Sequence, residues 1–213
     1  MLINRRDALS GLALACAAGR SLAAAPSPPD LSPEDAHDVT RVVTYLEALT
    51  SAKARFEQTD ARGAETRGTF FLQRPGKARF DYDPPSGLVI ACDGHNVAVV
   101  DRRLKTIQTY PLGLTPLVLF LAQDIRLDRG VRVRQVLREA GSVTVVAEDA
   151  AKKMKGSIAL TFSEPPLTLT GWTVTDARGG KVKVRLIDFS YSGPKDADFF
   201  KLVDPKRNAD QPS

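Results

Sequence analysis

The chain has 213 residues, with 30 Lys and Arg against 25 Asp and Glu, and 43% of its residues are hydrophobic. This length is sufficient for one domain with a sizeable core. The excess of positive charge is small and spread along the chain, without a basic run interleaved with aromatic residues, so the composition argues against a nucleic-acid-binding protein.

Residues 1–25 have the pattern of an export signal. A basic start is followed by a short apolar centre from Leu9 to Ala18 and by small residues at Ala23 to Ala25. The apolar centre is too short for a membrane span, which takes about 20 residues. We expect cleavage after Ala25. The pair Arg5 and Arg6 keeps the twin-arginine route open beside the general secretory route.

Residues 26–213 are then the expected mature chain, a single domain with loose ends at 26–31 and 206–213. Removal of the signal lowers the formal net charge from +5 to +3 and leaves Cys92 as the one cysteine. No disulfide within the chain is therefore expected. Cys16 offers an alternative, because a lipid-attachment cysteine at that position would anchor the protein to a membrane.

A helix is predicted to begin after Ser32, with Ser32 as N-cap, Pro33 as the first helical residue and acidic residues in the first turn. Apolar residues follow at helical spacing, and they are Val39, Val42, Val43, Leu46 and Leu49. This apolar stripe should lie on another element. Three charged residues are expected to face away from it, namely Asp38, Arg41 and Glu47.

From Lys53 onward, apolar and polar residues alternate with a period of two. Eleven runs bounded by turn residues are predicted as strands, at 53–61, 66–74, 77–83, 87–92, 95–101, 104–110, 131–139, 142–149, 156–164, 168–177 and 181–191. Their short connections favour an antiparallel meander. In the last run the apolar parity changes near Leu186, which predicts a bulge and a bend in the sheet.

The stretch LTPLVLFLAQD interrupts the strands and predicts a second helix of about nine residues, with Thr115 as N-cap and Pro116 as first helical residue. From Leu117 to Leu121 this helix is apolar on every side. Such a helix is either covered on several sides by the core, or it lines a space that an apolar ligand enters.

No motif typical of an enzyme centre occurs in the sequence, which lacks G-x-S-x-G, C-x-x-C, H-E-x-x-H and a phosphate-binding glycine loop. Cys92 and His95 lie three residues apart and could suggest a thiol nucleophile with its base. However, Asp93-Gly94 between two strands is typical of a type I′ hairpin, so Cys92 is expected to be a core residue. We expect no enzyme, no metal site and no cofactor.

Several segments resemble the LolA family, the periplasmic carriers of outer-membrane lipoproteins. The resemblance runs from about Val43 to Pro205. Its most specific parts are Phe56-Glu57-Gln58, Arg74-Pro75-Gly76, the Asp93-Gly94 hairpin before VAVVD, and the closing run from Phe200 to Pro205. The resemblance implies a mainly β (α+β) fold, in which an incomplete antiparallel barrel of about eleven strands is covered by short helices.

The resemblance also implies a function. The protein would be a monomeric periplasmic carrier that shelters acyl chains in a hydrophobic cavity and shuttles lipoproteins from the inner to the outer membrane. The implied partners are acylated lipoproteins, an inner-membrane lipoprotein-releasing ABC transporter and an outer-membrane lipoprotein acceptor, without nucleic acid. Four alternatives stay open: a membrane-anchored lipoprotein receptor, a carrier of another envelope lipid, a sensor that binds an envelope regulatory partner, and an enzyme.

The resemblance assigns a role to Arg74, which matches the arginine of the family's RP motif and would latch the covering helices through their free carbonyl groups. Strand parity and the apolar helix predict the residues that line the cavity, namely Ala78, Phe80, Leu88, Ile90, Val99, Leu117, Phe120, Leu121 and Trp172. Ala78 stands where family members often carry an aromatic residue, which predicts a roomier cavity.

Overall fold

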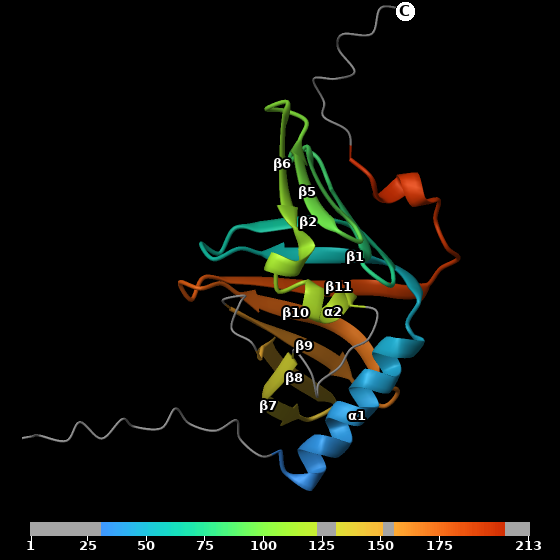
Figure 1. The fold of residues 1–213 in the computed structure, drawn as a ribbon, viewed down its shortest axis with the longest axis vertical. Helices are drawn as coiled ribbons and strands as arrows, with labels where there is room; N and C mark the ends of the chain where they lie inside the picture. Colours follow the sequence, from blue (N-terminus) through green and yellow to red (C-terminus); the bar gives the residue numbers. More distant parts are fainter. Residues whose placement is uncertain (1–30, 123–130, 151–155, 203–213) are drawn as a thin grey trace, which may run out of the picture.

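The structure is a computed structural model that describes residues 31–122, 131–150 and 156–202. Its strands form one antiparallel sheet in the order β6-β5-β4-β3-β2-β1-β11-β10-β9-β8-β7 (Figure 1). The strands are β1 (Ser51–Thr59), β2 (Glu65–Gln73), β3 (Lys77–Tyr82), β4 (Leu88–Asp93), β5 (Asn96–Asp101), β6 (Thr106–Pro111), β7 (Val131–Glu139), β8 (Ser142–Asp149), β9 (Ser157–Ser163), β10 (Thr168–Thr175) and β11 (Lys181–Tyr191). The sheet stays open between β6 and β7, so the predicted incomplete barrel of eleven strands is confirmed.

The sheet is bent where its first and last strands meet. Lys53 of β1 lies opposite Ser190, whereas Arg55 lies opposite Ile187, so β11 contains one extra residue in this interval. Asp188 within it has a φ of +54°. This is the bulge predicted near Leu186, and a bulge bends its strand. In Figure 1, β6 accordingly runs at a steep angle to β11.

The first helix, α1 (Pro33–Ala48), begins as predicted. The Ser32 side chain accepts the N–H of Asp35 at 3.1 Å, and Pro33 occupies the first helical position. The helix lies over the β7 to β10 half of the sheet (Figure 1), with Val42 and Leu46 buried against it. Neither α1 nor any other helix of the described residues is long and apolar enough to cross a membrane.

The expectation that Asp38 faces away from the sheet is wrong. Only 6% of Asp38 is exposed. Its carboxylate accepts hydrogen bonds from Arg41 at 2.9 Å and from Arg138 of β7 at 2.7 Å. Arg41, also expected to face away, is half-buried and pairs with Glu164. Asp38 can be buried because the two guanidinium groups replace its contacts with water.

The second helix, α2 (Val118–Leu121), is shorter than predicted, with four residues. Thr115 is not its N-cap. The chain first forms a 3₁₀ turn, η1 (Leu112–Leu114), and the Thr115 hydroxyl donates to the Leu112 carbonyl at 2.9 Å. The predicted last residues of this helix, 123 and 124, lie outside the described residues. Without a side-chain cap at its start, α2 depends on packing, and Phe120 and Leu121 are each 1% exposed.

A second 3₁₀ turn, η2 (Ala197–Phe200), covers the outer face of the sheet at β3 and β4. The Arg79 guanidinium of β3 lies 4.7 Å from the centre of the Phe199 ring and donates to the Phe199 carbonyl at 2.7 Å. Phe200 and Val89 are buried on this side. On the inner side, α2 contacts β8 and the turn η1, and Phe120 of α2 stacks on Trp172 of β10.

Candidate functional site

The face of the sheet beneath α2 is a continuous apolar surface. Strand register places Phe80 of β3, Ile90 of β4 and Val99 of β5 in one row across three strands. Phe70 of β2 extends the row on the other side. Because residues paired across antiparallel strands point to the same face, this row faces α2 from below.

The structure brings most of the predicted lining residues together. Five of them belong to one buried cluster, namely Ala78, Phe80, Phe120, Leu121 and Trp172. Ile90 and Leu117 are half-buried and pack against this cluster. Leu88 and Val99 lie on the same face by register but outside the cluster, and both are half-buried. Because Leu88 and Val99 are only half-buried, they lie toward the edge of the apolar face.

Trp172 of β10 lies at the centre of an aromatic group and is 3% exposed. Its ring stacks on Phe120 of α2, with 5.8 Å between ring centres, and meets Phe80 at 6.0 Å. The centre of the Phe70 ring lies 5.3 Å from that of Trp172, and the centre of the Phe56 ring, on β1, lies 5.6 Å from that of Phe80. Our sequence analysis missed Phe56 and Phe70, although Phe70 continues the same alternation as Leu72 across the hairpin from Phe80.

Arg74 connects the two helices above this face. One terminal nitrogen donates to the Leu46 carbonyl in the last turn of α1, and the other donates to the Ala122 carbonyl at the end of α2 at 2.6 Å. Burial lowers the pKa of the Arg74 guanidinium, and the nearby Glu47 partly opposes that effect. Helix-end carbonyls lack partners within their own helix, so this arginine satisfies two of them at once.

The turn that carries Arg74 also contacts α2 through its backbone. The Gly76 N–H donates to the Leu121 carbonyl at 2.7 Å. A Cβ atom on Gly76, whose φ is +76°, would lie 2.7 Å from the Cα atom of Gly94, so glycine lets the two neighbouring hairpin turns pack together. Beside them is a hollow of about 340 Å³ between these turns and one side of α2, with Val118 and Leu121 in its wall.

The turn after β4 differs from the predicted type I′ hairpin. A type I′ turn needs positive φ at both central residues, which the sequence pattern predicts to be Asp93 and Gly94. Gly94 has a φ of +105°, but neither Asp93 nor His95 has a positive φ. Asp93 instead ends β4, and its carboxylate accepts the N–H groups of His95 and Asn96, each at 2.8 Å. A carboxylate that binds two turn N–H groups stabilises the turn without the second left-handed residue.

Cys92 lies inside the core with no exposed surface. Burial raises the pKa of its thiol to about 12, so the thiol is protonated at neutral pH. His95, the base in the nucleophile hypothesis, is exposed. Within the described segments, no group of three or more His, Cys, Asp and Glu residues could hold a metal ion. The geometry around Cys92 is that of a core residue.

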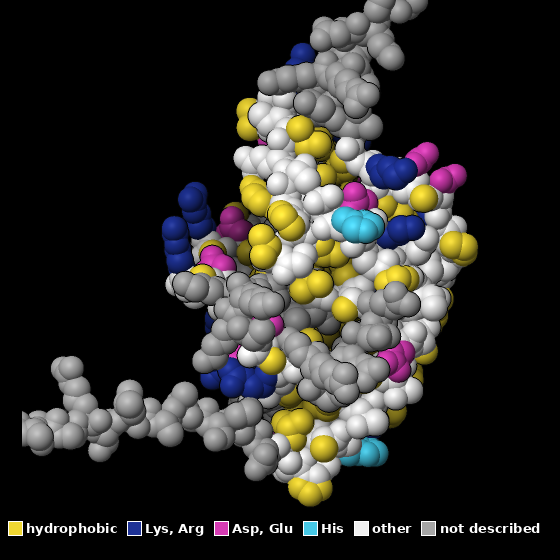
Figure 2. All heavy atoms as spheres, viewed as in Figure 1, with side chains coloured by type: hydrophobic (Ala, Val, Ile, Leu, Met, Phe, Trp, Pro, Cys, Tyr) yellow, Lys and Arg dark blue, Asp and Glu magenta, His cyan; other side chains and the backbone are white. Residues whose placement is uncertain are grey.

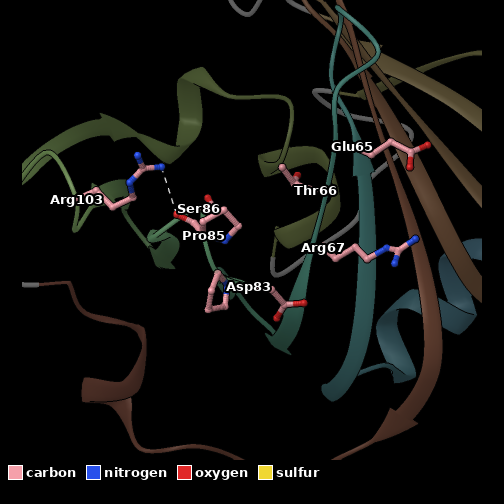
Figure 3. Close-up of a pocket in the computed structure, with 8 residues that line it drawn as sticks. Glu65, Thr66, Arg67, Asp83, Pro85, Ser86 and Arg103 are labelled. Carbon is pink, nitrogen blue, oxygen red and sulfur yellow. Dashed lines mark hydrogen bonds between the residues drawn. The ribbon is translucent and has the colours of Figure 1, made fainter.

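At the opposite end of the sheet is a polar hollow of about 650 Å³ (Figure 3). Its walls are formed by Glu65, Thr66, Arg67, Asp83, Pro84, Pro85, Ser86 and Arg103. Arg103 donates to the Pro85 carbonyl at 3.3 Å, and Asp83 pairs with Arg55 at 3.1 Å. Its mixed charges distinguish this hollow from the apolar face beneath α2.

The chain is similar to proteins of a known family. The model of the family described as outer membrane lipoprotein carrier protein LolA matches residues 47–203. An outer-membrane lipoprotein carrier protein from Chromohalobacter salexigens is 25% identical over 175 residues, which are 78% of this chain and 82% of the relative. One from Leptothrix cholodnii is 29% identical over 180 residues, or 80% of this chain and 83% of the relative.

Among solved structures, a DUF1329 family protein from Desulfovibrio piger matches with a TM-score of 0.52 at 7% sequence identity. The match covers 79% of this chain and 96% of that chain. At this identity the likeness concerns the fold alone.

Proposed function

Because the chain belongs to the LolA family of outer-membrane lipoprotein carriers, we propose that it shelters the acyl chains of lipoproteins between α2 and the sheet and carries them across the periplasm. The observation that carries the proposal is the Arg74 bridge between α1 and α2 above an apolar aromatic face. In this closed arrangement, Phe120 and Leu121 occupy the place that acyl chains would take.

The free energy of acyl burial is sufficient to displace a short lid. Transfer of one methylene from water to an apolar site is worth about 0.8 kcal/mol. Partial shelter of one chain of about 15 carbons would therefore offset the loss of the contacts that four residues of α2 make. The lining residues proposed for this role are the nine that strand parity and the apolar helix predict.

Release of cargo requires that the free energy of the closed, empty carrier be low enough, relative to that of the loaded carrier, for cargo to dissociate to an acceptor. The two hydrogen bonds of Arg74 form in the closed arrangement and would break when α2 moves away from α1. A ligand shifts such an equilibrium only by its differential affinity for the two states. Arg74 would thus lower the net affinity for cargo, which permits transfer to a stronger acceptor without a nucleotide site.

The proposed cycle includes an inner-membrane lipoprotein-releasing ABC transporter that loads the carrier and an outer-membrane acceptor that unloads it, with the carrier acting as a monomer. A second candidate, a carrier of another envelope lipid, is favoured by Ala78, which is buried opposite Cys92 and leaves more space than an aromatic residue. Identification of the lipids that co-purify with the protein distinguishes the two candidates. The question whether Cys16 carries a lipid lies outside the described residues, and mass spectrometry of the mature N-terminus answers it.

A matched pair of charge substitutions tests the cavity. Ile90 and Ile107 are both half-buried isoleucines of neighbouring hairpins, but register places Ile90 on the face beneath α2 and Ile107 on the outer face. We expect Ile90→Glu to weaken binding of a fluorescent fatty acid by about tenfold or more, because a buried carboxylate disfavours an acyl chain beside it. Ile107→Glu should bind as the unmodified protein does.

Circular dichroism of both variants checks that the sheet is retained. Normal fatty-acid binding by a folded Ile90→Glu variant, or equal loss in both variants, would contradict the assignment of the cavity to this face.

A further inference from the structure

The hairpin between β5 and β6 ends in an exposed tip formed by Arg102, Arg103, Leu104 and Lys105, called here the tip segment. The meander places it at the end of the sheet opposite Arg74. Figure 1 shows the hairpin projecting beyond the rest of the sheet. Leu104 is 71% exposed, the largest exposed fraction among the large hydrophobic residues in the described part of the chain.

The exposure of Leu104 does not come from an unstructured loop. The Asp101 carboxylate accepts the N–H of Arg103 at 2.8 Å and the N–H of Leu104 at 3.0 Å. The Arg102 N–H donates to the Gly87 carbonyl at 3.0 Å, which ties the tip segment to the neighbouring turn. The backbone therefore presents the leucine side chain outward in a defined position.

Lys105 adds an independent observation. Its φ is +51°, and among the described residues other than glycine, Asp188 alone shares a positive φ. Glycine or asparagine would adopt this left-handed conformation with less strain. Where a chain keeps a strained residue, the side chain is a candidate for function. The side chain kept here is a third cation beside an exposed leucine.

We propose that the tip segment contacts the surface of an anionic membrane, with Leu104 inserted among the headgroups and the three cations against lipid phosphates. Of the nearby acids, Asp83 pairs with Arg55, whereas Asp101 binds backbone N–H groups and keeps its negative charge, so residues 101–105 carry a formal net charge of +2. Glu65 lies across the polar hollow from Arg103 (Figure 3). An exposed leucine flanked by cations fits a lipid surface, because the headgroup phosphates can move to positions beside the cations.

Such a contact is weak. One basic residue near an anionic membrane contributes about fivefold to the partition coefficient, and the effect declines with ionic strength. Three cations and one leucine would therefore give weak and reversible binding to the membrane surface. The inference does not depend on acyl-chain binding, because the tip segment lies at the opposite end of the sheet from Arg74 and α2.

The test is flotation of the purified protein, processed as the cell processes it and without cargo, with two kinds of vesicles. One kind contains phosphatidylcholine alone and the other an equal mixture with phosphatidylglycerol. We expect the protein to float with the anionic vesicles only, and less as salt is raised. The triple variant Arg102→Gln, Leu104→Ser, Lys105→Asn should bind about tenfold more weakly or worse.

A matched control removes two cations from other exposed turns, at Arg62 and Arg178, through Arg62→Gln and Arg178→Gln. This control should retain binding within about threefold of the unmodified protein. Lys105→Asn alone should weaken flotation while raising the thermal midpoint, because asparagine relieves the left-handed strain. Equal binding to both kinds of vesicles, no binding to the anionic ones, or equal loss in the control would overturn the proposal.

Discussion

Among single residues, Arg74 makes the contacts that no other side chain type could make in its place. A guanidinium has donors in a rigid fork, and here its two terminal nitrogens reach carbonyls on α1 and at the end of α2. A lysine has one ammonium group on a flexible stem and cannot reproduce the fork. A hydrogen bond with one charged partner contributes about 1.5 to 3 kcal/mol, so loss of this bridge should shift the balance between closed and open lid.

We predict that Arg74→Leu loads cargo but releases it poorly. Without the two hydrogen bonds, the closed empty state is less stable relative to the loaded state, so the affinity for cargo rises by about tenfold. The measurement is transfer of a labelled lipoprotein from the loaded carrier to membranes that contain the acceptor.

Arg79→Leu is the control for this prediction. Arg79 is another partly buried arginine with a backbone carbonyl as partner, but it lies on the outer face against Phe199. It should lower thermal stability and leave transfer unchanged. Transfer by Arg74→Leu at the rate of the unmodified protein would remove the latch from the mechanism.

At the scale of elements, the two helices are attached to the sheet in different ways. Charged groups fasten α1, because Arg138 of β7 reaches Asp38 at 2.7 Å and Asp35 at 2.8 Å, while Arg41 pairs with Glu164. In contrast, α2 has four residues, all of them apolar and therefore without ion pairs; it is attached by apolar side chains, by backbone contacts and by the hydrogen bond from Arg74 to the Ala122 carbonyl. A helix of one turn has little stability of its own. We infer that α2 is the element that moves, whereas α1 stays on the sheet.

The charged attachment of α1 predicts the effect of Arg138→Ala. Among the described residues, this change leaves the buried Asp38 carboxylate with Arg41 as its remaining cationic partner. A buried acceptor that loses a partner costs about 1 to 3 kcal/mol. We expect the free energy of unfolding to fall by about 2 kcal/mol, measured by urea denaturation.

Arg134→Ala provides the comparison on the same strand. Arg134 is exposed and pairs with Glu148, which Arg132 also contacts, so its removal should change stability by about 0.5 kcal/mol or less. Similar losses in the two variants would show that Asp38 does not anchor α1.

At the scale of the whole molecule, the two proposed sites lie at opposite ends of the open sheet. One end carries the Arg74 turn and the carbonyl contacts with both helices, and the other carries the polar hollow and the tip segment. Figure 2 shows hydrophobic side chains exposed on this face of the molecule. Tyr110 and Leu114 are among the exposed large hydrophobic residues of the described part of the chain. The proposed lid and the proposed membrane contact therefore share no residues.

Trp172 is the single tryptophan of the chain and lies beneath α2, so it reports on the interior directly. We predict that a brominated fatty acid quenches its fluorescence, because bromine quenches on contact and an acyl chain in the proposed cavity would replace Phe120 against the indole ring. An unbrominated fatty acid of equal length is the reference for environmental shifts in emission.

Ile90→Glu should abolish the quenching, whereas Ile107→Glu should retain it. An acyl chain that binds tightly yet leaves Trp172 emission intact would place the lipid somewhere other than beneath α2.

Local patterns were sufficient to predict most of the fold. All eleven strands, the start of α1 at Ser32 and the bulge near Leu186 follow from alternation, turn residues and capping, which act over a few neighbouring residues. Strand parity, which places Phe80, Ile90 and Val99 on one face, is also a local pattern. A pleated strand determines the side of each residue from its neighbours alone.

Other features depend on segments far apart in the chain. Asp38 is buried with a partner, Arg138, that lies 100 residues later in the chain. The one-turn helix α2 is held by the packing of Phe120 on Trp172 and by the hydrogen bond from Arg74 to Ala122. The glycine at position 76 is likewise required by a separate turn, because a Cβ atom there would lie 2.7 Å from the Cα atom of Gly94. Burial of a charge and the length of an apolar helix are set by contacts that form when the sheet folds, and periodicity carries no information about those partners.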